Sequence, residues 1–290
     1  MTGTGATEFI DSTTADVFIP ELWSPLALIA REQNLVFAHK VDRRFEGGLT
    51  WGDLIHVPSV GNLSARAKAK SSNAAILYET ITETNTDITI ATWEYTAIAV
   101  ESIVKIQNNR DQLAMYAGKM GYGLALSIDN VLAGLVDDFT QTVGTLAVEN
   151  TDTEYIRSRQ FLRDADAPND SIFWCISPAA MSGLLKLDKF VRDDYSGVHG
   201  PGRKETGLQQ AYVTSIYGDP VYVSTNVEGS NAAGHDNTIM QREALALVVQ
   251  MQPTPWFFKD IDFFVDKVAL EQLSGTREMR DDHGVFIKGA

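Results

Sequence analysis

Hydrophobic and polar positions follow two different periods in the first half of this chain. From Ile76 to Val100 they alternate, as in a strand with one buried face, and the segment is rich in strand-forming residues. From Leu113 onward apolar residues recur every three or four positions, which predicts one helix from about Arg110 to Phe139. An extended segment followed by one long helix is therefore the first feature of the predicted fold.

The extended segment is predicted to be the returning limb of a long two-stranded excursion. Leu54 to Val57 reads as a strand that stops at Pro58, because proline cannot donate a ladder hydrogen bond. Residues 59–75 are polar and small. An isolated hairpin is only marginally stable in water, so we expect this excursion to lie against another surface.

The hydrophobic parity changes within the returning limb. Ile88 and Ile90 share one face, whereas Trp93 and Tyr95 have the opposite parity. Successive strand residues point to opposite faces, so one regular strand cannot place both sets on the same side. The change predicts a bulge or bend near Thr92.

The long helix carries start signals and three weak points. Asn109 is an N-cap candidate with Gln112 as its capping-box partner. Gly118, Gly121 and Gly123 weaken its middle by up to about 1 kcal/mol each relative to alanine, and they permit a bend or a close approach. At about 1.5 Å per residue, roughly 30 residues would span about 45 Å, which suits a spine that carries other parts.

Residues 145–260 alternate short helical and strand patterns and read as a separate α/β lobe. The weaker signals are a polar surface loop at 228–237, a strand or helix at 244–250, a hinge-like linker at Pro253 and Pro255, a short helix at 25–33, and an extended piece at 41–45. The stronger signals are a helix at 153–165, a buried strand at 172–176, a helix at 178–185, a hairpin around Gly218-Asp219-Pro220, and closing strands at 260–273 and 285–287.

Composition describes a globular protein with strongly acidic charge. The 290 residues are 44% hydrophobic, enough to bury at least one core and, in our interpretation, two lobes. The formal net charge is -14, which argues against a protein whose main task is to bind phosphates, since Lys and Arg dominate such binding. It leaves open a protein that surrounds nucleic acid, because an acidic wall repels DNA.

The sequence carries few signs of enzyme chemistry. It contains neither a Walker-type phosphate loop nor a Gly-x-Ser-x-Gly elbow, and its five histidines never fall at i, i+4 spacing. The one cysteine, Cys175, lies in an apolar run and reads as a buried hydrophobe in a reducing compartment. Asp260, Asp262 and Asp266 resemble a carboxylate cluster, but strand alternation predicts a solvated face. No apolar stretch approaches the roughly 18 residues needed to span a bilayer, and no secretory signal is present.

The excursion carries cations on its outgoing limb and carboxylates on its return. Arg66, Lys68 and Lys70 alternate with alanines, and Glu79 and Glu83 follow on the returning limb. Two interpretations are open: a solvated loop, or a protruding loop whose cations contact acidic groups of a neighbouring copy. Under the second, these five residues are candidates for contacts between subunits. Since a polar N-terminal arm and this excursion cannot bury themselves within one chain, we favour a self-assembling structural protein.

Four stretches, through their order and spacing, resemble the major capsid proteins of tailed bacteriophages, which have the Hong Kong 97-type fold. No single motif among them is specific. The stretches are Gly52-Asp53-Leu54-Ile55-His56-Val57-Pro58, the Thr-rich strand into Glu101, the helix from Gln112 to Phe139, and Gly207-Leu208 through Gly218-Asp219-Pro220-Val221-Tyr222-Val223-Ser224.

The resemblance implies an α+β capsid fold and a structural role in a shell. Its expected parts are an N-terminal arm at 1–46, an extended β-hairpin loop with leading strands at 47–100, a peripheral domain with the spine helix at 101–144 and 257–290, and an axial α/β domain at 145–256. Hexamers and pentamers of such subunits close into an icosahedral head that encloses double-stranded DNA.

Partners and location follow from the same resemblance. The chain starts at Met1 with no room for a cleaved scaffolding region, so a separate scaffolding protein is expected, together with a portal and an optional decoration protein. Assembly is expected in the bacterial host cytoplasm, and the mature location is the virion capsid, with no cofactor, metal or membrane. Some relatives cross-link a loop lysine to an asparagine; Lys68 and Lys70 lie in that loop, but no partner is matched.

Two alternatives to a phage head are open at this point. An encapsulin-like cellular compartment would share the fold and enclose cargo instead of a genome. A soluble hydrolase with dispersed catalytic residues belongs to a different class, and a stable monomer with a deep pocket would favour it.

Overall fold

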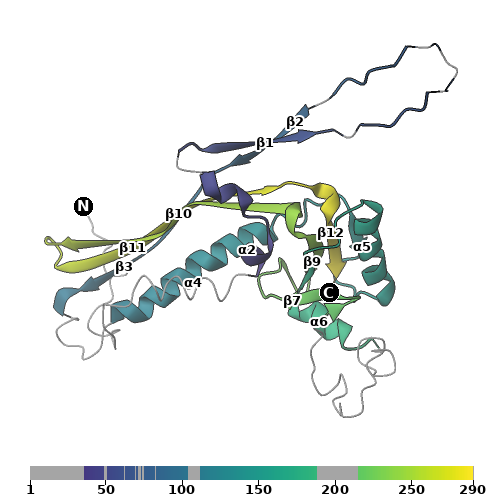
Figure 1. Ribbon diagram of the computed structural model, residues 1–290. Helices are drawn as coiled ribbons and strands as arrows, with labels where there is room; N and C mark the ends of the chain where they lie inside the picture. Colours follow the sequence, from purple (N-terminus) through teal and green to yellow (C-terminus); the bar gives the residue numbers. More distant parts are fainter. Residues whose placement is uncertain are drawn as a thin grey trace, which may run out of the picture.

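The computed structural model describes residues 36–48, 51–61, 63–68, 70, 73, 75–81, 83–103, 112–187 and 215–289. Figure 1 shows three parts: a mixed sheet with short helices, a narrow sheet that runs out beside one long helix, and a two-stranded ribbon that projects away from both. Helices and strands alternate irregularly along the chain, as an α+β fold requires.

The mixed sheet has seven strands in the order β4-β12-β9-β5-β7-β6, with β8 paired to β9. Strand β5 pairs antiparallel to β9 and parallel to β7. Helices α5 (Asp152–Asp164) and α6 (Pro178–Leu184) pack against this sheet. The strands are β4 (Thr142–Gly144), β5 (Ile172–Ile176), β6 (Ser215–Ile216), β7 (Asp219–Val223), β8 (Gly229–Ser230), β9 (Gly234–Gln241) and β12 (Gly284–Gly289).

Local signals explain why these elements form where they do. All residues of β5 are buried, and Trp174 packs against Tyr155 of α5 with ring centroids 5.7 Å apart. Ser177 caps α6 by accepting a backbone N–H at 3.0 Å. Thr151 and Glu154 form a capping box at the start of α5. The buried strand and the two short helices predicted for this lobe are therefore confirmed.

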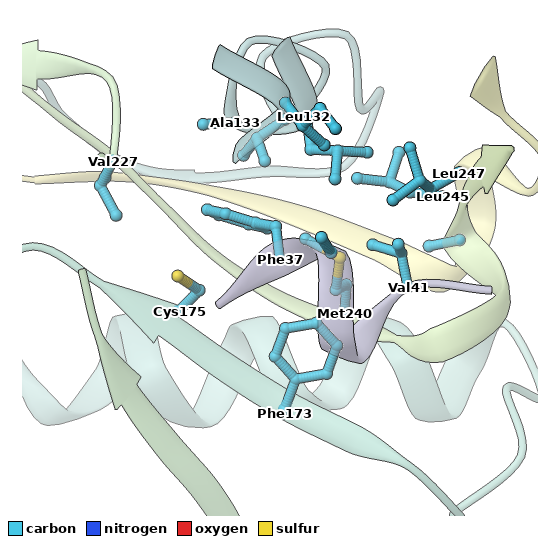
Figure 2. Close-up of a cluster of buried hydrophobic side chains, with 14 of the residues drawn as sticks. Phe37, Val41, Leu132, Ala133, Phe173, Cys175, Val227, Met240, Leu245 and Leu247 are labelled. Carbon is cyan, nitrogen blue, oxygen red and sulfur yellow. The ribbon is translucent and has the colours of Figure 1, made fainter. Parts of the chain in front are cut away.

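The long helix α4 (Gln112–Ala133) joins the mixed sheet to the narrow sheet through one apolar cluster. Figure 2 shows Leu132 and Ala133 of α4 beside Leu245 and Leu247, together with Phe37 of the short helix α2 (Phe37–Lys40). Side chains from β5 and β9 complete the cluster. Burying each large aliphatic or aromatic side chain stabilises the fold by about 1.5–3 kcal/mol, so this cluster fixes the position of α4.

The narrow sheet is antiparallel with the order β10-β11-β3, and α4 covers one of its faces. Val268 and Leu270 of β11 are buried, and Gln272 on the same face donates to the Leu124 carbonyl of α4 at 3.2 Å and to Glu94 at 2.9 Å. Strand residues alternate between faces, so the odd-numbered residues of β11 lie on the face opposite α4. The strands are β3 (Thr92–Glu101), β10 (Leu245–Asp260) and β11 (Val265–Glu278).

The ribbon consists of β1 (Leu54–Val60) and β2 (Glu83–Thr89), which pair antiparallel along their whole length. Strand β2 stops at Thr89 and β3 starts at Thr92, so the bend predicted from the parity change is confirmed. Ile88 and Ile90 are buried at the root of the ribbon, whereas Trp93 is exposed beyond the bend. The change of face allows one chain segment to serve two differently oriented sheets.

A buried carboxylate links α4 to two other segments. Asp129 is fully buried, and it accepts the Phe37 N–H at 2.9 Å and the Asn226 side-chain amide at 2.8 Å. Burial raises the pKa of the Asp129 carboxyl, and these hydrogen bonds oppose the rise because they stabilise the charged form. Asp129 therefore holds the first turn of α2 and the loop after β7 against the long helix.

Prolines interrupt fewer strands than the sequence predicts. The strand expected to stop at Pro58 continues to Val60, and the linker expected at Pro253 and Pro255 lies inside β10. A proline is tolerated where its missing N–H faces an open edge, and both the ribbon strands and β10 have one. The register of β10 against β11 shifts twice near these prolines, so the predicted break survives only as an irregularity within one strand.

The long helix ends earlier than the predicted Phe139. Helix α4 stops at Ala133, Gly134 follows it, and the Leu135 N–H bonds the carbonyl three residues back at 3.3 Å. Acidic residues at 137 and 138 would face the negative end of the helix dipole, which disfavours continuation. The described helix has 22 residues and spans about 33 Å instead of about 45 Å.

The polar loop predicted at 228–237 is also wrong, because 234–241 form β9 in the middle of the mixed sheet. Its polar first half has no apolar alternation, but it pairs with β12 on one side and with the short strand β8 on the other, which satisfies backbone groups. The ambiguous segment at 244–250 is strand, and the extended piece at 41–45 instead leads into a 3-10 helix, η2 (Arg44–Gly48).

The closing strand predicted at 260–273 is interrupted by a turn. Strand β10 ends at Asp260, residues 261–264 reverse the chain, and Phe264 adopts a φ of 53°. Asp260, Asp262 and Asp266 therefore do not share one strand face. The strand predicted at 285–287 is confirmed within β12, and the hairpin around Gly218 is confirmed as β6 and β7.

Several expectations lie outside the described residues, namely the helix at 25–33, the cap at Asn109 and the polar arm. The division into four parts stays a prediction. Strands β4 and β12, which that division assigns to the part containing α4, both lie in the mixed sheet.

Asp129→Asn should destabilise the isolated subunit by on the order of 2 kcal/mol, because the new amide faces the Asn226 amide and one buried donor loses its acceptor. Urea unfolding of unassembled subunits measures the change. The double variant Asp129→Asn, Asn226→Asp exchanges donor and acceptor and should regain part of the loss. A double variant less stable than the single one would contradict this role.

Candidate assembly interface

The ribbon tip, defined as residues 61–81, extends beyond the paired strands and carries apolar side chains in solvent. Its backbone forms neither helix nor strand in the described residues. Figure 1 shows it as the part farthest from the rest of the chain. The large apolar side chains of the tip, which are 55 to 90% exposed, are Leu63, Ile76, Leu77, Tyr78 and Ile81.

The five candidate contact residues lie on this ribbon, but the structure brings only two of them together. Arg66 Nη2 lies 3.3 Å from Glu79 Oε1 across the tip, within the same subunit. Hydrogen bonds from Ser64, and then from Arg66, lower the pKa of the Glu79 carboxyl. Lys68 and Lys70 are exposed, and Glu83 begins β2 opposite Val60. Whether any of them contacts a neighbouring copy stays a prediction.

The face of the narrow sheet opposite α4 forms a second apolar surface, which we call the outer sheet face. Pairing register places Trp93, Tyr95, Trp256 and Phe258 on it, around Glu271 of β11. The four aromatic side chains are 60 to 73% exposed. Trp93 Nε1 donates to Glu271 at 3.0 Å and Trp256 Nε1 donates to its other oxygen, so the carboxylate orients both indoles.

The turn between β10 and β11 adds a third exposed apolar group. Ile261, Phe263 and Phe264 are each at least 65% exposed. In Figure 1 this turn lies at the far end of the narrow sheet, away from the mixed sheet. The positive φ at Phe264 has a steric cost for a bulky residue, so its position in the turn is held by the hairpin.

Together these surfaces expose more large apolar side chains than a soluble monomer normally tolerates. Contiguous exposed apolar patches mark interaction sites or aggregation hazards. Sequence reasoning singled out the charged residues of the ribbon tip and missed the aromatic surfaces. The cluster Trp256-Phe257-Phe258, followed by Phe263-Phe264, carried the signal. A strand pattern alone does not tell which face of a sheet is left uncovered.

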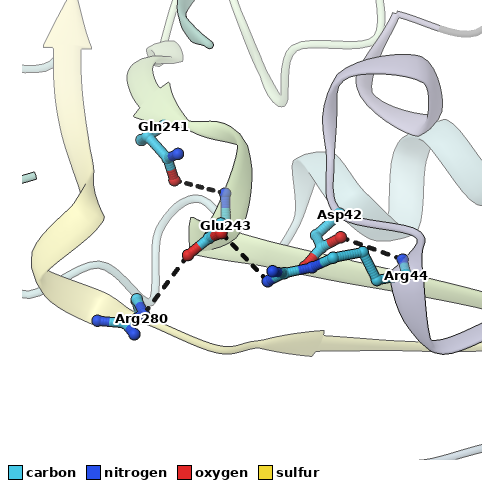
Figure 3. A network of polar contacts seen from close by, with 5 residues as sticks. All are labelled: Asp42, Arg44, Gln241, Glu243 and Arg280. Carbon is cyan, nitrogen blue, oxygen red and sulfur yellow. Dashed lines mark hydrogen bonds and ion pairs between the residues drawn. The ribbon is translucent and has the colours of Figure 1, made fainter. Parts of the chain in front are cut away.

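A polar cleft of about 540 Å³ lies at the root of the ribbon, between β1, β2 and three 3-10 turns. Figure 3 shows the ion pairs in its wall: Arg44 lies 2.7 Å from Asp42 and 3.2 Å from Glu243, and Arg280 lies 3.9 Å from Glu243. Gln241 accepts the Glu243 N–H at 2.6 Å. These charges satisfy one another and join η2 to η3, while the neighbouring Phe45 packs against the apolar cluster at the ribbon root. The turns are η2, η3 (Arg242–Ala244) and η4 (Asp281–His283).

Near this cleft, Glu278 is the carboxyl with the most unusual environment. Burial first, then the neighbouring Asp281 and Asp138, raise the pKa of Glu278 to about 7. Arg277 opposes the rise. Because two carboxyls share this space, Glu278 holds its proton at a pH where an exposed glutamate is ionised.

The residues considered for enzyme chemistry are dispersed. His39, His56, His235 and His283 lie on α2, β1, β9 and η4, while His199 is outside the described residues. Within the described chain no group of three or more His, Cys, Asp or Glu side chains is placed to hold a metal ion. Burial raises the pKa of the Cys175 thiol well above its ordinary value, which disfavours the nucleophilic thiolate.

Among the helices that the structure describes, none is long and apolar enough to cross a membrane. No protein-family model and no curated protein matches this sequence.

Solved structures match the chain over most of its length. A chain from Mycobacterium phage Che8 is 20% identical, with a TM-score of 0.75, covering 88% of this chain and 91% of that chain. The mature capsid of bacteriophage PhiM1 is 15% identical, with a TM-score of 0.67 and coverage of 88% and 87%. A virus-like particle from Pyrococcus furiosus is 12% identical, with a TM-score of 0.61 and coverage of 92% and 98%.

The protein therefore has the fold of tailed-phage capsid proteins, and the α+β Hong Kong 97-like class predicted from the sequence is confirmed. The same architecture occurs in the archaeal particle.

Glu278 should make subunit stability fall as the pH rises from about 5 to about 8. Its folded-state pKa of about 7 lies above the ordinary 4.5, so the folded state binds the extra proton between these values. The stabilisation that protonated Glu278 contributes is fully present below its ordinary pKa of 4.5 and is lost as the pH rises through about 7. Glu278→Gln should raise the urea midpoint at pH 8 and change it little at pH 5.

The matched control is Asp170→Asn, which makes the same carboxylate-to-amide change at an exposed position before β5. An equal shift for Glu278→Gln at pH 5 and pH 8 would show that Glu278 does not hold this proton.

Proposed function

We propose that this protein is the major capsid subunit of a tailed bacteriophage, a structural protein that self-assembles into a shell. The observation that carries the proposal is a capsid fold whose ribbon tip and outer sheet face both expose apolar side chains. A projecting ribbon cannot bury its own tip, so another copy must cover it. Many weak, repeated contacts then give a stable lattice through multivalency.

The chemistry of the two surfaces supports contact between them. The ribbon tip offers apolar side chains with Arg66, Lys68 and Lys70, and the outer sheet face offers four aromatic rings around Glu271. Apolar burial supplies most of the driving force, and opposite charges select the register. In this proposal the tip of one subunit lies across the sheet of the next. Glu79 and Glu83 then orient the basic limb or contact the neighbour directly.

The finer features of the proposal follow from the capsid fold. The ribbon serves as the extended loop, α4 with the narrow sheet as the peripheral domain, and the mixed sheet as the axial domain around the capsomer axis. Hexamers and pentamers close into an icosahedral head around double-stranded DNA, and the net charge of -14 suits a wall that does not trap its genome. A separate scaffolding protein, a portal and an optional decoration protein complete assembly in the host cytoplasm.

An encapsulin-like compartment is the second candidate, because the virus-like particle from Pyrococcus furiosus shares this fold over 92% of the chain. Nucleic acid content separates the two. Shells isolated with packaged DNA support the phage head, whereas shells that retain a protein cargo and exclude DNA support the compartment.

Charge reversal of Arg66, Lys68 and Lys70 to glutamate should leave the subunit folded but prevent shell closure. Circular dichroism should be unchanged, since all three residues lie on the exposed tip, and negative-stain microscopy should show no closed shells. The control reverses three exposed cations elsewhere, at 157, 163 and 186, and changes the net charge equally. Normal shells from the tip variant, or equal loss in the control, would contradict a role for these cations.

Replacing Trp256 and Phe258 by serine should raise the concentration needed for assembly by at least about tenfold. Losing one buried aromatic anchor typically costs 1 kcal/mol or more at an interface, and about 1.4 kcal/mol corresponds to a tenfold change. Light scattering against concentration measures the threshold. Ile156→Ser, an exposed aliphatic residue on α5, is the control. An unchanged threshold in the double variant would exclude the outer sheet face from the contact.

Negative-stain microscopy of the expressed protein, alone and with a co-expressed scaffolding candidate, tests the proposed function directly. Closed shells or capsomer rings are the expected result. A compact monomer under both conditions would overturn the proposal.

A further inference from the structure

The ribbon crosses the narrow sheet at a single glycine. Strand β3 begins at Thr92, which pairs with Ser274 of β11, so the pairing stops one residue short of Gly275. The segment that joins β2 to β3 passes over Gly275 instead. A Cβ atom on Gly275 would lie 2.5 Å from the Thr89 carbonyl oxygen and 3.0 Å from the Ile90 Cα. Both are backbone atoms, so no side-chain rotation relieves the contact.

Register defines which side of the sheet the ribbon crosses. Gly275 pairs opposite Val248, and odd-numbered residues of β11 face away from α4, so the crossing is on the outer sheet face. The small residues Gly275 and Ala246 leave room there, and Ile88 and Ile90 fill it as fully or nearly fully buried side chains. The ribbon root and the aromatic surface therefore occupy the same side of one sheet.

Apolar packing adds to the attachment of the ribbon, because the partly buried Ile55 and Val57 of β1 pack against the same cluster as Ile88 and Ile90. The Gln250 side chain of β10 donates to the Gly52 carbonyl at 2.9 Å and so joins the sheet to the ribbon root, while the Ile90 N–H donates to the Asp53 carbonyl at 2.8 Å within the root itself. Strand β11 cannot move away, because it is paired to β10 and its other face is backed by α4 through Gln272. Any added volume at Gly275 must therefore displace the ribbon.

A small displacement at the root is amplified along the ribbon. A shift of the Thr89 carbonyl by about 1 Å along the strand, against a pivot on the paired strand about 4.8 Å away, rotates the ribbon within its own plane by about 10°. Nine residues of extended chain span about 30 Å, so the same rotation moves Thr80, which lies beyond the start of β2, by about 5 Å. The ribbon tip lies farther out still.

We propose that Gly275 is the positioning residue that sets the angle between the ribbon and the narrow sheet, and thereby the curvature of the assembled shell. The link to shell curvature rests on the proposed function, since curvature has meaning only if ribbons reach neighbouring copies. The role of Gly275 in setting the ribbon angle concerns one subunit and does not depend on the proposed function. The residue acts through volume alone, because its backbone is not in the left-handed region where alanine itself would be strained.

Gly275→Ala tests the angle in unassembled subunits. Spin labels on Thr80→Cys and Lys259→Cys, both exposed, report the distance between ribbon and sheet, and the native Cys175 is too buried to react. The expected result is a shift of the mean distance by about 5 Å. Gly118→Ala and Gly183→Ala, where an added Cβ meets open space, are the controls and should leave the distance unchanged. No shift in Gly275→Ala overturns the proposal.

Shell diameter tests the link between Gly275 and the curvature of the shell. Gly275→Ala should assemble into shells of a different or mixed diameter under conditions where the wild type and Gly118→Ala give one size. Identical diameters, with a shifted label distance, would overturn the link to curvature. If the wild type forms no shells at all, the proposed function fails, while the label distance still decides whether Gly275 sets the angle.

A second variant keeps the test decisive if Gly275→Ala does not fold. Ala91 lies in the unpaired step between β2 and β3 and is exposed, so Ala91→Gly loosens the joint without adding volume. The label distances should broaden, because glycine admits more backbone conformations at the bend. An unchanged distribution in Ala91→Gly would show that contacts outside this joint set the angle, and that would overturn the assignment of the angle to the crossing at Gly275.

Discussion

The narrow sheet has two faces, and the long helix α4 covers only one of them. Gln272 and its neighbours on β11 fix that side to α4, where hydrogen bonds to Leu124 and Glu94 satisfy a fully buried amide donor. The other side is left to the ribbon root at one end and to exposed aromatic rings along the rest. Leaving so much apolar surface in water is unfavourable, and the proposed assembly removes that cost by placing other copies over it.

Polar groups decide how rigidly these surfaces are presented. Asp129 holds the start of the described chain against α4, and the ion pairs around Glu243 hold the turns beside the ribbon root. Neither group contributes much net stability, since burying or ordering charges offsets most of what their contacts gain. Their effect is to restrict the subunit to one arrangement. The proposed shell would need that restriction, because an error in angle at one subunit is repeated at every neighbour.

The sequence predicted an element well where the whole segment lies in one uniform environment. The buried strand 172–176 and the capped helices beside it required only local burial and capping signals. It failed where tertiary pairing replaced local pattern: β9 has polar residues in the middle of a sheet, and Pro253 sits inside an edge strand. For the candidate interface, the charged tip was visible as alternating alanine and cation. The aromatic outer sheet face was not, because periodicity does not reveal which face stays uncovered.

The sequence itself determined the bend between Ile90 and Trp93 and the order of elements by which the chain resembles a capsid fold, because both rest on spacing and parity that any fold of this chain must respect. Tertiary structure alone decided where the ribbon crosses the sheet and why position 275 is glycine. That choice depends on the Thr89 carbonyl lying 2.5 Å from where a Cβ would be, a contact between residues far apart in the chain. Sequence patterns encode periods and local preferences, whereas close approach of two backbones exists only after the elements have packed.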